Sequence, residues 1–104
     1  MEEFIKVAQT SEIGPGTGKC VEVEGEKIAI FNVEGQFYAI EDTCTHAEGP
    51  LSEGTLTGEE VECPFHGACF NIKTGEATSP PAVTGVKTYR VKVSGGEIEV
   101  AVRE

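Results

Sequence analysis

Two short stretches organise this chain, Cys44-Thr45-His46 and Cys63-Pro64-Phe65-His66. Each offers one thiolate and one imidazole, and sixteen residues separate His46 from Cys63. Four such ligands in two segments suit either zinc or an iron–sulfur centre. A common zinc finger takes two Cys from one segment and two His from another, whereas both stretches here mix the two types. A two-iron cluster in which His replaces Cys on one iron needs this mixture, with Cys44 and Cys63 on the buried iron and His46 and His66 on the outer one.

The composition predicts one strand-rich domain. The chain has 104 residues, enough for a single core, with 13 Gly and 5 Pro spread among short apolar runs. No helical periodicity of useful length is visible, and no run approaches the roughly 18 apolar residues of a membrane span. The acidic start at residues 1–4 leads into no apolar signal segment. We therefore expect an all-β protein of the cytoplasm that is not bound to a membrane.

Alternating polar and apolar residues predict where the strands lie. The turns Glu24-Gly25 and Glu34-Gly35 should join three strands into a meander over residues 19–41. A further alternating run covers residues 87–93 without a break. Cys20 sits between apolar neighbours, and we expect it to be a small buried core residue. The remaining strands are expected at residues 4–8, between the turns at residues 53–54 and 57–58, and at residues 60–62 and 97–102. Residues 70–72 and 76–78 should form a small hairpin.

The ligand pattern C-x-H-x16-C-x-x-H, with Cys-Pro-x-His-Gly at residues 63–67, resembles that of the Rieske ferredoxins. The resemblance implies a single Rieske domain over residues 1–104. In it, a β-sandwich base formed by about residues 1–41 and 83–104 carries a small cluster-binding β subdomain at about residues 42–82. It also implies one Rieske-type 2Fe–2S cluster bound by Cys44, His46, Cys63 and His66, covered by a third loop near Pro80-Pro81. A plain connector is the alternative for that loop.

Departures from related patterns narrow the function that the resemblance implies. Respiratory Rieske proteins carry an extra Cys in each ligand loop, and Gly49 and Phe65 stand at those positions here. Oxygenase components carry a large catalytic domain, for which 104 residues leave no room. The resemblance therefore implies a monomeric one-electron carrier, not itself an enzyme. It would pass electrons from an NAD(P)H-dependent flavoprotein reductase to a terminal oxygenase. The alternatives are a Rieske electron-transfer subunit for a non-oxygenase reductase partner and a zinc-stabilised binding module.

Charge indicates what kind of partner the chain meets. The net charge of −10 disfavours nucleic acid and anionic membranes. Between Ile28 and Ile72 there are eight acids and no Lys or Arg, and this window contains both ligand stretches. The acids either keep a small protein soluble or dock partners that present basic surfaces, and we expect the reductase and the oxygenase to present such surfaces.

Two residues near the second ligand stretch predict a low reduction potential. In high-potential relatives, Ser and Tyr occupy the positions of Ala68 and Phe70, and their hydroxyls donate hydrogen bonds to sulfur. Ala and Phe have no donor, so the potential should lie near about −150 mV, the low end for this cluster type. Cys69 lies three residues after His66, but we expect it to be neither a ligand nor a redox partner.

Overall fold

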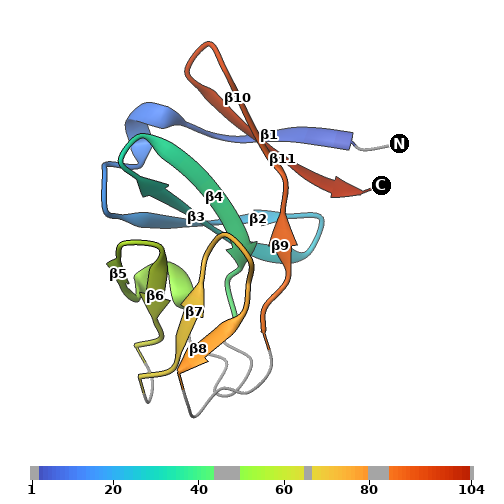
Figure 1. Ribbon diagram of the computed structural model, residues 1–104. Coiled ribbons are helices and arrows are strands. Elements are labelled where there is room, and N and C mark those ends of the chain that lie inside the picture. Colours follow the sequence, from blue (N-terminus) through green and yellow to red (C-terminus); the bar gives the residue numbers. More distant parts are fainter. Residues whose placement is uncertain (1–2, 44–49, 65–66, 80–84, 104) are drawn as a thin grey trace.

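The computed structural model is built almost entirely of strands (Figure 1). It describes residues 3–43, 50–64, 67–79 and 85–103. These residues form three antiparallel sheets and two single-turn 3-10 helices, η1 (Thr10–Glu12) and η2 (Leu51–Glu53). None of the described helices is long and apolar enough to cross a membrane. Because the described residues lie mainly in the strands of three sheets, the all-β prediction is confirmed.

Hydrogen bonding sets the order of the strands within each sheet. The first sheet runs in the order β1 (Glu3–Gln9), β11 (Glu97–Arg103) and β10 (Val91–Ser94). The second, called the middle sheet, is β2 (Gly18–Val23), β3 (Glu26–Val33), β4 (Gln36–Glu41) and β9 (Thr88–Tyr89). The third, called the small sheet, is β5 (Thr55–Thr57), β6 (Glu60–Glu62), β7 (Cys69–Asn71) and β8 (Ala77–Ser79).

The predicted meander is confirmed in β2, β3 and β4, which pair in sequence order. Both of its turns place two consecutive residues at positive φ: Glu24 at 52° with Gly25 at 86°, and Glu34 at 51° with Gly35 at 92°. Such turns match the right-handed twist of the strands that they join, and Gly is the residue that adopts this conformation at least cost. The two Glu-Gly pairs therefore fix the register of the meander.

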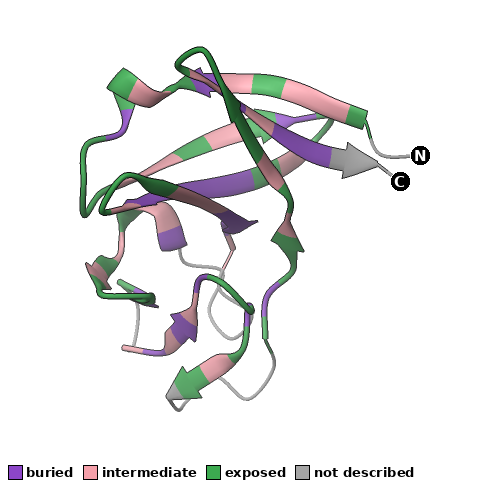
Figure 2. Cartoon of the chain, turned by 45° about the horizontal axis from the view of Figure 1, so that its top comes forward, coloured by how far each residue is buried: buried purple, intermediate pink, exposed green. Residues whose placement is uncertain are grey.

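Strand β3 contributes to two separate cores, one on each face of the middle sheet. Ile28 and Ile30 pack with Ile98 and Val100 of the first sheet. Ala29 and Phe31 point to the opposite face and join a second core with residues of the small sheet. Because successive side chains of a strand alternate between faces, a strand buried on both sides reads as a continuous apolar run. Figure 2 shows the buried stretch along the middle sheet in purple.

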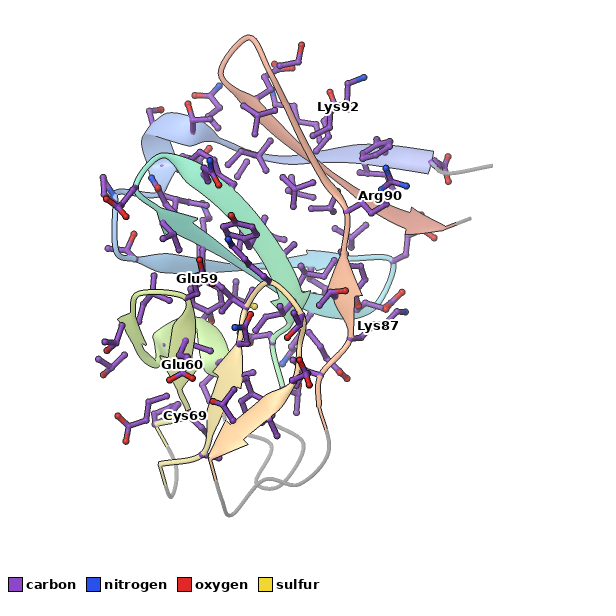
Figure 3. The ribbon with its side chains drawn as sticks, viewed as in Figure 1. Glu59, Glu60, Cys69, Lys87, Arg90 and Lys92 are labelled. Atoms are coloured by element: carbon purple, nitrogen blue, oxygen red, sulfur yellow. The ribbon has the colours of Figure 1, made fainter. Side chains whose placement is uncertain are left out.

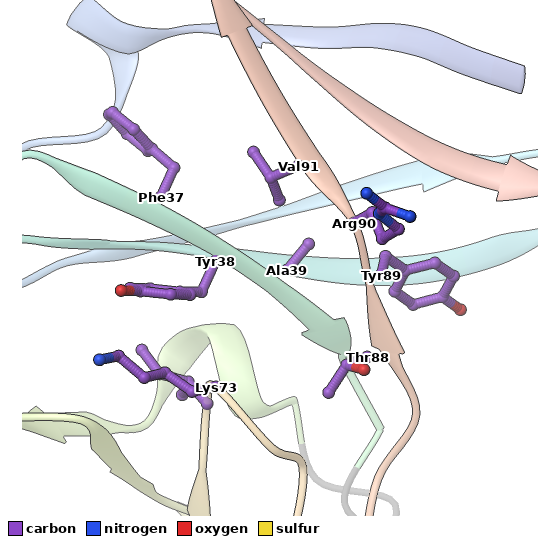
Figure 4. Close-up of a pocket in the computed structure, with 9 residues that line it drawn as sticks. Phe37, Tyr38, Ala39, Lys73, Thr88, Tyr89, Arg90 and Val91 are labelled. Carbon is purple, nitrogen blue, oxygen red and sulfur yellow. The ribbon is translucent and has the colours of Figure 1, made fainter. Parts of the chain in front are cut away.

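The structure corrects the prediction of one strand over residues 87–93. The chain leaves the middle sheet at Arg90: β9 pairs with β4, whereas β10 pairs with β11 of the first sheet. The Arg90 carbonyl accepts a hydrogen bond from Ala101 N at 3.0 Å, which attaches the crossing point to the first sheet. Figure 4 shows Arg90 at this crossing. A strand that changes sheets closes the corner of the sandwich without interrupting the alternation of the sequence.

The prediction that Cys20 is buried is wrong, because Cys20 is exposed. Val21 and Val23 of the same edge strand pack against the core between the first and middle sheets. Cys20 therefore faces the other way, opposite Ala29 in the register of β2 and β3. The predicted small hairpin is confirmed as β7 and β8. The division into subdomains at about residues 42 and 82 stays a prediction.

Candidate metal centre

Of the four predicted ligands, the structure describes Cys63. Cys44, His46 and His66 lie outside the described residues, so their convergence on one site stays a prediction. The described residues on either side of the ligand stretches nevertheless show how each stretch is held. Both stretches begin where a strand of an antiparallel pair ends, after β4 and after β6.

The second ligand stretch is the loop of the β6–β7 hairpin. Glu62 pairs with Cys69 at the end of the two strands, and Cys63 N donates to Ala68 O at 2.7 Å. Gly67 has φ +75°, a conformation that residues with a side chain rarely adopt, so Gly suits the return of this loop. The hairpin therefore holds the Cys63 backbone in place through contacts that the protein itself provides.

Cys63 is shielded from water, with only 1% of its surface exposed. It belongs to the core between the middle and small sheets, where Leu51, Ala68 and Phe70 are all fully buried. Gly54 allows close packing behind it, because a Cβ there would lie 2.1 Å from Glu62 O, the carbonyl just before Cys63. A sulfur ligand in this position suits the inner side of a metal centre.

The first ligand stretch is held at both ends by Asp42, a residue with only 4% of its surface exposed. Its carbonyl accepts Leu51 N at 2.6 Å, and its carboxylate Oδ1 accepts Ser52 N at 2.8 Å. Thr43 and Pro50 form an isolated antiparallel bridge next to these bonds. The sequence reasoning missed Asp42, which it counted only as part of the acidic window; its place directly after a strand and two residues before a ligand was the available signal.

The predicted third loop contains Pro80-Pro81, which lie outside the described residues. The described residues beside it are closely packed: Val86 N donates to Gly75 O at 2.7 Å, and a Cβ on Gly85 would lie 2.5 Å from the same oxygen. The covering role of this loop stays a prediction.

Three exposed acids on or beside the small sheet take part in no salt bridge among the described residues. Four described lysines, Lys6, Lys19, Lys73 and Lys87, form salt bridges with Glu97, Glu12, Glu59 and Glu26 respectively. Within the described residues, Glu53, Glu60 and Glu62 are exposed and take part in no salt bridge. Figure 3 shows Glu59 and Glu60 on one side of the molecule, with Lys87, Arg90 and Lys92 following β9 and β10 on the other.

Lys73 connects the small sheet to the middle sheet. Its ammonium group lies 2.8 Å from Glu59 and 5.6 Å from the centre of the Tyr38 ring on β4. Figure 4 shows Lys73 and Tyr38 at the edge of a hollow that Phe37, Tyr89 and Arg90 also line. The volume of this hollow is about 310 Å³. The hydrogen bond and charge of Glu59 raise the pKa of Lys73.

The two thiols outside the predicted ligand set are both poor nucleophiles. Although Cys20 is exposed, the protein around its thiol removes part of the water that would stabilise a thiolate. This desolvation, followed by the charge of Asp42 and a hydrogen bond to it, raises the pKa of Cys20 to about 11. Burial and the charges of Glu62 and Glu60 raise the pKa of Cys69, whose Sγ lies 3.7 Å from Gly67 O. Neither thiol has the lowered pKa of a reactive cysteine.

Comparison with known proteins identifies the family. The model of the Rieske [2Fe-2S] domain matches residues 3–90. This chain belongs to the Rieske [2Fe-2S] domain family. Ferredoxin CarAc of Metapseudomonas resinovorans is 46% identical over 99 residues, which are 94% of this chain and 92% of that protein.

Two solved structures extend the similarity to three dimensions. The ferredoxin of carbazole 1,9a-dioxygenase from Nocardioides aromaticivorans IC177 is 35% identical with a TM-score of 0.92, over 96% of this chain and 98% of that one. One chain in a complex of reduced oxygenase and oxidized ferredoxin in carbazole 1,9a-dioxygenase is 44% identical with a TM-score of 0.91, over 97% and 94%. The predicted Rieske fold is confirmed.

Family membership confirms the cofactor as one Rieske-type 2Fe–2S cluster, and a zinc-stabilised module is no longer an alternative. The residues present fit this group. The two ligand stretches contain two Cys and two His, which is the donor set of such a cluster, and the described one, Cys63, is buried in an anchored hairpin. The relatives are ferredoxin components of oxygenase systems, which agrees with a carrier rather than a catalytic enzyme.

Proposed function

We propose that this chain is a one-electron carrier that accepts an electron from an NAD(P)H-dependent flavoprotein reductase and delivers it to a terminal oxygenase. The observation that carries the proposal is the 44% identity, over almost the whole of both chains, to a protein in a complex of oxygenase and ferredoxin. We also propose a cytoplasmic location, where paired cysteines are more often metal ligands than disulfides. We expect a monomer, which the elution volume on gel filtration would test.

In this proposal Cys44 and Cys63 hold the inner iron, and His46 and His66 hold the outer one. When bound, the cluster takes up and releases a single electron. The protein contributes the shielding of Cys63 and the anchored ends of both ligand stretches. The buried position of Cys63 supports its assignment to the inner side.

Metal analysis of single-residue variants tests the ligand set. Native protein purified without oxygen should contain about two irons and two sulfides per chain, because that is the cluster type. Cys63→Ser should lose the cluster and its red-brown absorption. Cys69→Ser is the matched control, a cysteine of the same hairpin, and should keep both. Full iron content in Cys63→Ser, or loss in Cys69→Ser alone, would contradict the assignment.

We further propose that partners with basic surfaces dock on an acidic face formed by Glu60 and Glu62 of β6 and by Glu53 of η2. These three acids are exposed and have no salt-bridge partner among the described residues, so their field is not cancelled locally. Complementary charge speeds diffusional encounter more than it strengthens the final complex.

The rate of reduction by the reductase tests the docking face. It should fall as salt rises, because ions screen exposed charges beyond about 8 Å at physiological ionic strength. Glu60→Lys should slow the reaction at low salt and flatten its salt dependence. Glu97→Lys makes the same change of charge on the hairpin of β10 and β11, at the cost of one weak surface ion pair, and should leave the rate unchanged. A rate indifferent to salt would mean that these acids only keep the protein soluble.

A further inference from the structure

We propose that Asp42 is a positioning residue of the metal centre, whose buried side chain fixes both ends of the stretch that carries Cys44 and His46. The inference rests on the ligand assignment proposed above. It concerns a residue outside the ligand set, at the point where β4 ends.

Asp42 ties three parts of the chain together. Its N–H donates to Lys27 O at 3.0 Å on β3, and its carbonyl accepts Leu51 N at 2.6 Å on η2. Its carboxylate Oδ1 accepts Ser52 N at 2.8 Å. The entry to the ligand stretch is thus bound to β3 and to the exit of the same stretch.

The two bonds to η2 have a specific role. The first N–H groups of a helical turn have no partner within the turn and must find one elsewhere. Asp42 supplies both acceptors, one from the main chain and one from the side chain. Leu51 of η2 is fully buried in the same core as Cys63. Through η2, Asp42 therefore anchors the first ligand stretch to the core that contains Cys63 of the second ligand stretch.

A buried carboxylate is an energetically unfavourable acceptor for the Ser52 N–H. Burying a charge is unfavourable unless it is paired, and no salt bridge joins Asp42 to a Lys or Arg within the described residues. The thiol of Cys20 is a hydrogen-bonding neighbour, but it is uncharged at neutral pH because its pKa is about 11. An amide oxygen could accept the Ser52 N–H without this cost, so the negative charge itself requires an explanation.

The charged residue lies only two positions before a proposed ligand in the sequence. Two residues of fully extended chain span at most about 7 Å, which bounds the distance between the Cα atoms of Asp42 and Cys44. A poorly hydrated negative charge on a residue so close in sequence to a ligand would oppose the addition of an electron to the site. Asp42 should therefore lower the reduction potential as well as hold the loop.

Three variants of the cluster-loaded protein separate these effects. Asp42→Asn keeps an oxygen that can accept the Ser52 N–H but removes the charge, whereas Asp42→Ala removes both. Glu53→Gln is the matched control, because it removes one charge from the exposed residue next to Ser52. Cluster loss to an iron chelator is followed by bleaching, and the midpoint potential is measured by voltammetry on the isolated protein. No reductase or oxygenase is needed, so the result is independent of the proposed partners.

Asp42→Ala should lose its cluster about tenfold faster than the wild type, which corresponds to about 1.4 kcal/mol. Asp42→Asn should lose it at nearly the wild-type rate, and its potential should rise above those of both the wild type and Glu53→Gln. The proposal is overturned if Asp42→Ala loses its cluster at the wild-type rate. It is equally overturned if the potential of Asp42→Asn equals that of Glu53→Gln, and this second comparison decides alone if the alanine variant does not fold.

Discussion

Gly54 lies so close to the strand that leads to Cys63 that a methyl group has no room there. Its backbone angles, φ −78° and ψ 177°, are ones that alanine adopts readily, so conformational strain does not enter. The obstacle is contact alone: a Cβ would lie 2.1 Å from Glu62 O, whereas real Cβ atoms essentially never approach within 3.0 Å. In Gly54→Ala the two backbone segments must move apart by about 0.9 Å.

The size of the effect follows from which atom is in the way. An added group in a packed site typically costs about 1–3 kcal/mol. The upper end applies here, because the obstructing atom is a main-chain oxygen that cannot rotate aside as a flexible side chain would. For a domain of about 100 residues, 3 kcal/mol lowers the melting temperature by roughly 12–24 °C. The displaced segment continues into Cys63, so cluster loss to a chelator should accelerate as well.

Thermal unfolding followed by circular dichroism measures the first effect, and bleaching of the cluster measures the second. Gly14→Ala is the control, since no atom lies within 4 Å of its Cβ and its φ is not positive. It should be neutral, or more stable by up to about 1 kcal/mol through a less flexible unfolded chain. If Gly54→Ala unfolds within about 0.5 kcal/mol of Gly14→Ala, the close approach of Gly54 to the strand does not exist in solution.

Two further predictions concern the potential and a thiol. Ala68→Ser with Phe70→Tyr should raise the midpoint potential by on the order of 100 mV if both hydroxyls donate to sulfur, since about 1.4 kcal/mol in favour of the reduced form is 59 mV for one electron. Voltammetry would contradict this prediction if neither Ala68→Ser alone nor Phe70→Tyr alone changed the midpoint potential. The Cys20 thiol, with its pKa raised from 9.0 to about 11, should react with iodoacetamide about tenfold faster per pH unit from pH 8 to pH 10. Cys20 therefore makes its full contribution to the free energy of unfolding below about pH 9. This contribution is lost as the pH rises toward 11, because the unfolded chain releases the thiol proton first. A rate that levels off near pH 9, with Cys20 distinguished from Cys69 by peptide mass, would refute the assigned pKa.

Local patterns predicted the parts of the fold that depend on neighbours in sequence. The pairs Glu24-Gly25 and Glu34-Gly35 predicted their turns, because a turn with two positive φ values has few suitable residues. Alternation over residues 19–41 correctly predicted the three strands of the meander. The spacing of the ligand motif predicted the family and the cofactor, since few metal centres require that mixture of ligands.

Features that depend on distant contacts were not predictable in this way. Alternation says which face a side chain occupies but not which sheet a strand joins, so the crossing at Arg90 was missed. It also cannot say whether a face is covered, and Cys20 lies on a face that is open at the edge strand. The place of Asp42, two residues before a predicted ligand, could have drawn attention to it. Its bonds could not be predicted, because Leu51 and Ser52 lie about ten residues away and nothing in the local sequence indicates that they return to it.

The burial of β3 on both faces has a consequence for protein engineering. A designer who transplants the cluster-binding hairpin into another host would have to bring Ala29, Phe31 and Ile40 with it, because these residues form one wall of the core that contains Cys63. Strand β3, which carries Ala29 and Phe31, also carries Ile28 and Ile30 on its other face. These two residues then need a new apolar surface in the host. The smallest portable unit is therefore larger than the small sheet and includes the meander. Host scaffolds should be chosen for a sheet that can accept a packing layer on each side.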